Sequence, residues 1–215
     1  MDNVRVIRDE DWRKARKSAF EWVQRGHQQY ITARTLYWKH FLFQFALLGA
    51  HAMELYLKAF LIHKIGEYPI GTRGHWLDAI YLECMKYDTF FEDESLSSHF
   101  LLEKVPKEGQ PELWCNYVEP LRYPELLVEK PTAFVVHYSS NSAGTCETLN
   151  CIAHFMHKTI PQPPHISGRG SVINELLAGR GYLDSLGQPE NASEIIDLFL
   201  RHNRYFAPPT ADQTI

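Results

Sequence analysis

Four polar side chains lie at helical spacing inside the most apolar stretch of the chain. Gln44, His51, Glu54 and Lys58 follow one another at intervals of seven, three and four residues, so a helix places them on one face. Glu54 and Lys58 form an i, i+4 pair with the acid first, which is the stabilising order. Because a buried unpaired charge is costly, we expect this stripe to hold the fold and, secondarily, to line a ligand pocket.

A second group of polar residues can join that stripe. His75 begins the next predicted helix in "GHWLDA", where its imidazole can hydrogen-bond back toward Glu54 and Lys58. Two arginines nearby in the predicted bundle add positive charge suited to an anionic ligand. The sequence therefore predicts a nucleotide or small-ligand site formed by Glu54, Lys58, Arg73, His75 and Arg122.

Metal chemistry is the other use that these residue types allow. Cys146, Cys151, His154 and His157 share one side of a predicted helix, and all four are residue types that bind zinc. One straight helix cannot close four ligands around a single ion. We therefore predict no metal site and no cofactor, and we expect this side of the helix to face outward or a dimer partner.

Composition limits the classes of protein to consider. The chain has 215 residues, a net charge of −4 and 45% hydrophobic residues, which favours a folded domain without a strongly basic surface. Its four cysteines do not form a disulfide framework, and the charged N-terminus does not read as a signal peptide. The apolar stretch from Phe41 to Ile65 contains Glu54 and Lys58, so we expect a cytoplasmic protein with no membrane partner.

Helical periodicity dominates the chain. We predict an all-α bundle of four or five helices over residues 1–160 and a short helical extension over 161–215. The first helix has acidic residues 9–11 at its start and ends near Trp38 after about 25 residues. The other predicted segments are Phe41–Ile65 followed by Gly66, a helix from His75, pieces at Leu96–Glu103 and Glu112–Val118, an irregular stretch at 119–144, Thr145–Thr159, and two amphipathic helices in the extension.

The order of these motifs resembles the HEPN domain family. The segment "FALLGAHAMELYLKAFL" followed by "GHWL" is similar to the helix pair that marks such domains, and "LRYP" at 121–124 is similar to another of their segments. The resemblance covers roughly residues 15 to 158. The matching positions are Ala52, Glu54, Leu57, Lys58, Ala59, Leu61, Gly74, His75 and Leu77.

The resemblance implies a small helical bundle that is often dimeric. Many HEPN domains are metal-independent ribonucleases, which carry Arg, four to six residues, then His near the start of the last bundle helix. In this chain no arginine precedes His154 at that distance. Arg34 and His40 have the spacing, but they lie at the junction of the first two predicted helices, where we expect a solvent-facing arginine.

Three functions remain open at this point. The first is a non-catalytic binding or regulatory protein in a prokaryotic defence or toxin–antitoxin system. We expect such a protein to be a homodimer and to contact RNA, a nucleotide or a protein encoded nearby. The second is a divergent metal-independent ribonuclease that uses Arg34 and His40, or His154 with Arg122. The third is a nucleotide or small-ligand binder that uses the group around Glu54 and Lys58.

Overall fold

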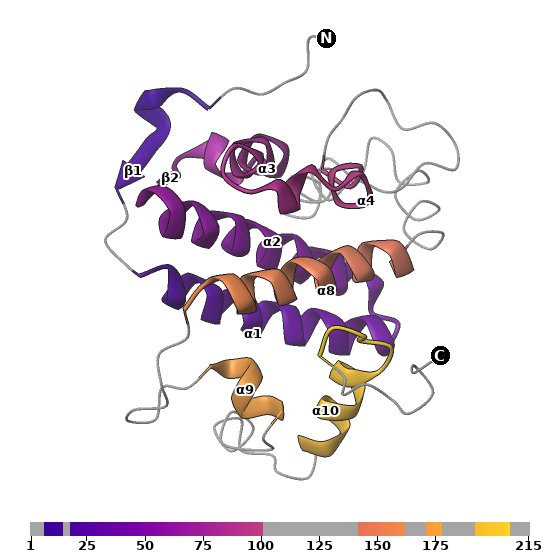
Figure 1. Cartoon of the computed structure of the whole chain (residues 1–215). Coiled ribbons are helices and arrows are strands. Elements are labelled where there is room, and N and C mark those ends of the chain that lie inside the picture. The colour runs from indigo at the N-terminus through magenta and orange to yellow at the C-terminus, as the bar shows by residue number, and fades with distance from the viewer. Residues whose placement is uncertain (1–6, 15–17, 101–141, 162–170, 178–191, 207–215) are drawn as a thin grey trace, which may run out of the picture.

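The computed structural model describes residues 7–14, 18–100, 142–161, 171–177 and 192–206, and this part of the chain is mostly helical (Figure 1). The predicted all-α class is therefore confirmed. The α-helices are α1 (Ala19–Trp38), α2 (Leu42–Ile65), α3 (Leu77–Met85), α4 (Glu94–Ser97), α8 (Ser142–Thr159), α9 (Val172–Leu177) and α10 (Ala192–Leu200). Short 3-10 helices are η1 (Asp9–Asp11), η2 (Thr72–His75) and η3 (Thr89–Glu92).

Helix α2 is the central element of the bundle. Every residue from Ala52 to Ile62 is buried, with α1 and α8 packed on one side of the helix and α3 on the other (Figure 1). The predicted end at Gly66 is confirmed, because Gly66 adopts a left-handed φ of 73° and its N–H donates to the Ile62 carbonyl. Among the described helices α2 alone is long and apolar enough to cross a membrane, and 83% of its most apolar window is buried.

A glycine allows α1 to approach α2 closely. A Cβ atom on Gly26 would lie 2.6 Å from the Tyr56 ring, closer than side chains ever pack. The Tyr56 side chain is fully buried at this crossing. Glycine at position 26 therefore sets the distance between the first two helices.

The N-terminal segment differs from the sequence prediction. Helix α1 begins at Ala19, and the residues before it form η1 and the strand β1 (Trp12–Lys14). This strand pairs antiparallel with β2 (Glu67–Pro69), so that Arg13 lies opposite Tyr68. The prediction of a helix that starts at acidic residues 9–11 and continues into α1 is wrong. Residues 12–14 instead form backbone hydrogen bonds with β2, the strand that follows Gly66.

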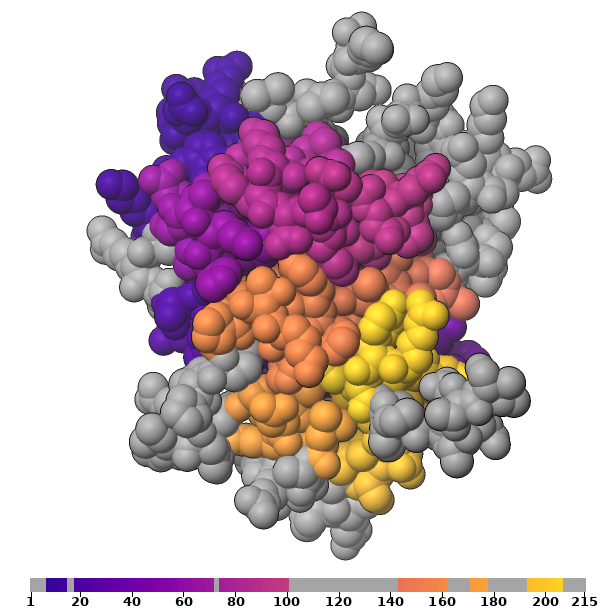
Figure 2. Space-filling model, viewed as in Figure 1, coloured from indigo at the N-terminus to yellow at the C-terminus, as the bar shows by residue number. Residues whose placement is uncertain are grey.

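The C-terminal extension packs onto the bundle. Helices α9 and α10 pack against α1 (Figure 1), and Ile173, Leu176 and Phe199 belong to the buried core. Figure 2 shows α8 at the surface between α3–α4 on one side and α9–α10 on the other. Residues 101–141 contain the predicted helix at 112–118, the "LRYP" motif and most of the irregular stretch predicted at 119–144, and they lie outside the described residues. The last three residues of that stretch, 142–144, were predicted wrongly, because α8 begins at Ser142.

Candidate functional site

The structure brings together three of the residues predicted to bind a ligand. Lys58 Nζ lies 2.9 Å from Glu54 Oε1, and His75 Nδ1 donates to the same oxygen at 2.8 Å. The side chains of Glu54 and Lys58 are each only 6% exposed, whereas that of His75 is 44% exposed. The predicted Glu54–Lys58 pair and the bond from His75 are therefore confirmed, and the group opens to solvent on the histidine side.

Backbone close to the ammonium group fixes this cluster. A Cβ atom on Gly74 would lie 2.6 Å from the Pro69 carbonyl oxygen and 3.7 Å from Lys58 Nζ, so only glycine fits between them. The Tyr68 ring lies 5.8 Å from the same Nζ and contacts Trp22 at a centroid distance of 4.9 Å. The cluster thus fastens α2 to β2, to η2 and to the start of α1.

Electrostatics keep the Glu54 carboxylate ionised. Burial alone would raise the pKa of Glu54, but the Lys58 ammonium and the hydrogen bond from His75 outweigh it and hold the pKa below its ordinary value. A buried acid stays charged in this way only when cations or donors face it directly. The Glu54 carboxylate is therefore ionised at neutral pH beside Lys58 Nζ.

The remaining predicted residues of this site are placed differently. Gln44 is exposed and His51 is half-buried, so the polar stripe runs from solvent at the start of α2 into the core at Lys58. The backbone of Arg73 belongs to η2, and its side chain lies outside the described residues. Arg122 also lies outside them.

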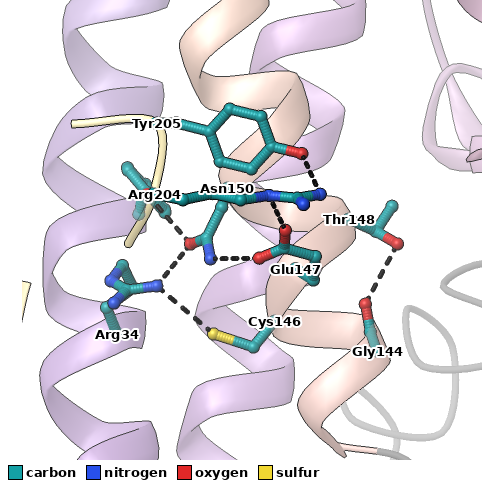
Figure 3. Close-up of polar contacts among 9 residues, drawn as sticks. Arg34, Gly144, Cys146, Glu147, Thr148, Asn150, Arg204 and Tyr205 are labelled. Atoms are coloured by element: carbon teal, nitrogen blue, oxygen red, sulfur yellow. Dashed lines mark hydrogen bonds and ion pairs between the residues drawn. The ribbon is translucent and has the colours of Figure 1, made fainter. Parts of the chain in front are cut away.

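Arg34 is the centre of a second buried polar network. Its side chain is inside the core, which makes the expected solvent-facing arginine wrong. Nε donates to the Phe199 carbonyl at 3.0 Å and Nη2 to the Arg201 carbonyl at 2.6 Å. Nη1 donates to Asn150 Oδ1 and to Cys146 Sγ (Figure 3).

The acceptors explain why a buried arginine is tolerated here. All four are neutral, and two are carbonyl groups at the C-terminal end of α10, where the helix dipole concentrates negative charge. The guanidinium carbon also lies 5.9 Å from the centre of the Phe199 ring. Arg34 therefore caps α10 and ties the extension to α1.

An outer layer of contacts continues this network across α8. Asn150 Nδ2 donates to Glu147 at 3.2 Å, and Arg204 Nε lies 2.7 Å from the other Glu147 oxygen (Figure 3). The Arg204 guanidinium also donates to the Tyr205 hydroxyl at 3.1 Å. Tyr30 donates its hydroxyl to Asn150 at 3.0 Å from the α1 side. Residues far apart in the chain are joined by these bonds.

The candidate catalytic pair is not assembled. Arg34 is buried against α8 and α10, whereas His40 is exposed in the turn between α1 and α2 with a φ of 61°. His154 lies on α8, where its ring contacts those of Tyr205 and Phe206 at 5.6 and 5.3 Å. Burial lowers the pKa of His154, and Lys158 adds to that shift.

The side of α8 that carries cysteine and histidine, predicted to face outward or a dimer partner, is partly covered within the chain, since Cys151, His154 and His157 are half-buried. Cys146 is buried, and burial raises the pKa of its thiol to about 11 although Arg34 acts in the opposite direction. Residues 201–206 pack over Cys151 and His154. Within the described residues, no three His, Cys, Asp or Glu side chains gather as metal ligands.

Several members of these networks were not predicted from the sequence. His27, Tyr30 and Arg34 lie at positions i, i+3 and i+7 of α1 and all face the core. That spacing was the available signal, because core-facing residues of α1 follow the same period. Asn150 carried no comparable signal, since only Glu147 is its neighbour on α8 and its other partners, Tyr30 and Arg34, come from α1.

Comparisons of the chain with protein-family models, with curated proteins and with solved structures find no match.

Proposed function

We propose that the chain is a non-catalytic, HEPN-like binding or regulatory module that acts as a homodimer. The observation that carries this proposal is the commitment of Arg34 to the fold, with its donors bound to two α10 carbonyls, Asn150 and Cys146. A guanidinium held in this way cannot reach a phosphodiester together with the exposed His40. The defence or toxin–antitoxin setting follows from the resemblance alone, and the cytoplasmic location from the composition of the sequence.

Cleavage of RNA tests the non-catalytic part of the proposal. Purified protein is incubated in EDTA with single-stranded RNAs of varied sequence, beside His40→Ala and His154→Ala variants. We expect no cleavage above the buffer control from any of the three proteins. Cleavage by the unmodified chain that either variant abolishes would establish the ribonuclease alternative in its place.

Exposed aromatic side chains support the homodimer. Phe41 is 53% exposed at the start of α2, beside the exposed His40. Light scattering is expected to give twice the 25.0 kDa chain mass, and Phe41→Glu should shift the protein toward monomer. Tyr87→Glu is the matched control, because Tyr87 is 38% exposed beyond the end of α3. A 25 kDa species at micromolar concentration would contradict the dimer.

A second candidate function is the binding of a nucleotide or another small anion beside Lys58. Among the described contacts its buried ammonium donates one hydrogen bond, to Glu54, and it can donate two more. The half-exposed His75 leaves this group open on one side. A thermal-shift screen of nucleotides should show stabilisation that His75→Gln weakens and that the control His63→Gln, on exposed α2 surface, leaves unchanged. A flat screen argues against this candidate.

A further inference from the structure

Three imidazoles gather where α8 meets the segment that follows α10, and residues 201–206 of that segment are called the latch. His154 and His157 lie one turn apart on α8, and the Phe206 ring lies 5.3 and 5.9 Å from theirs. The His157 ring is also 5.4 Å from that of His27 on α1. The latch thus covers two histidines directly and a third one layer deeper.

The deeper contacts leave little room for added charge. His27 is fully buried, and its Nδ1 lies 2.8 Å from the Tyr56 hydroxyl. Nε2 of His27 and Nδ1 of His157 are buried and have no hydrogen-bond partner among the described residues. A proton added to either nitrogen would therefore be buried without an acceptor, which is strongly unfavourable.

The charged groups around the histidines are mostly positive. Lys158 acts on both α8 histidines, and His154 acts on His157. The packed elements also bring the Tyr56 hydroxyl of α2 to His27, Asn174 of α9 to His157, and the Tyr205 ring of the latch to His154. Two carboxylates, Glu147 and Asp93, act on Cys151 on this side of α8, but neither is among the causes that shift the two histidines. Glu147 also pairs with Arg204 at 2.7 Å. Protonated imidazoles would therefore meet like charge.

The same surroundings act on the titration of each ring. Burial lowers the pKa of His157, and Lys158 and His154 lower it further. A hydrogen bond with Asn174 acts in the opposite direction but is the smallest of these effects. Burial is also the main cause that lowers the pKa of His154. Both imidazoles are consequently neutral when the latch is closed at pH 7.

We propose that residues 201–206 form a pH-sensitive latch, which closes over α1 and α8 at neutral pH and opens in mild acid when His154 and His157 bind protons. Opening uncovers the Arg34 and Asn150 side chains beneath it. This inference does not depend on the proposed function, since it concerns only the closure of the extension.

Linkage gives the size of the effect. A histidine that stays neutral in the closed state and titrates near 6.5 in the open state shifts the opening equilibrium up to about tenfold between pH 7.5 and 5.5. Two such histidines give up to about 100-fold. The direction is fixed, because the state with the higher pKa gains protons as the pH falls.

Hydrogen exchange on the full chain measures this opening. The Asn203 and Phe206 amides donate to the Leu200 and Asn203 carbonyls, so they exchange only when the latch opens. After correction for intrinsic rates, we expect their exchange to accelerate at least tenfold from pH 7.5 to 5.5. The His154→Gln/His157→Gln double variant should lose most of that acceleration, and the exposed-site control His63→Gln should keep it.

Two results would overturn the latch. One is exchange in the unmodified chain that does not change with pH, and the other is an acceleration that the double variant retains in full. If the double variant fails to fold, NMR titration of the unmodified chain decides instead. Ring pKa values for both His154 and His157 below 6.5 support the latch, and values at or above 6.5 refute it.

Discussion

Replacement of Lys58 by methionine tests the buried ion pair most severely. Methionine keeps much of the volume of the lysine side chain but removes the ammonium, which leaves the Glu54 carboxylate 6% exposed with His75 as its remaining described partner. Breaking a buried pair from one side costs about 3–5 kcal/mol of unfolding free energy, because the other charge stays buried. Lys58→Met should therefore be among the most destabilising single changes in the chain.

The pair can also be removed as a whole. In Glu54→Leu/Lys58→Met neither charge remains buried, and replacement of a buried pair by apolar groups is often neutral or stabilising. We expect the double variant to recover most of the stability that Lys58→Met loses. The loss in the single variant should also shrink as the pH falls from 8 to 5, because Glu54 without its ammonium protonates more easily.

Urea denaturation followed by far-UV circular dichroism measures both variants. With m values of about 1–3 kcal/mol/M, the single variant should lower the midpoint by at least about 1 M. Lys86→Met is the matched control, since Lys86 pairs with Glu83 at 2.7 Å but its side chain is 63% exposed. That control should change stability by less than about 0.5 kcal/mol. A loss below about 1 kcal/mol for Lys58→Met would refute the buried pair.

Three further predictions concern the packing around both networks. Arg34→Lys keeps the charge but loses the forked contacts to α10, so it should lower the free energy of unfolding by about 2–4 kcal/mol in urea denaturation. The control Arg25→Lys, at an exposed position, should give no measurable change in the same assay. Gly26→Ala places a Cβ 2.6 Å from the Tyr56 ring and should cost about 1–3 kcal/mol by the same assay; an unchanged midpoint would contradict the close crossing. The pKa of Glu54 is lower in the folded chain than its ordinary value of 4.5, so its ionised carboxylate stabilises the fold at pH values above 4.5. This contribution is lost as the pH falls through the folded pKa. In acid denaturation curves, the difference in unfolding free energy between the native chain and Glu54→Gln should therefore shrink below pH 4.5.

The central helix could be predicted because its signals are local. Glu54 and Lys58 are one turn apart, the apolar run around them is continuous, and Gly66 supplies the left-handed end. His75 completes the cluster only 21 residues from Glu54. Short sequence separations of this kind can be read from helical periodicity.

The structure of the N-terminal segment and of the α8 surface could not be predicted in this way. Trp12 continues the helical spacing of apolar residues Ala15 and Ala19, yet residues 12–14 pair with a strand more than 50 residues later. The partners of Arg34 are 116 and 165 residues away, at Asn150 and Phe199. A local pattern shows neither that an arginine is buried nor that a later segment covers α8, because both depend on tertiary contacts.

The exchange rate of the Arg34 Nε–H proton tests most directly whether this arginine belongs to the fold. In protein labelled with ¹⁵N-arginine, its resonance is identified as the one missing from Arg34→Lys. A proton that donates to the Phe199 carbonyl inside the core should exchange far more slowly than that of the exposed Arg25. Exchange as fast as that of Arg25 would show a solvent-accessible guanidinium and would contradict the commitment of Arg34 to the core.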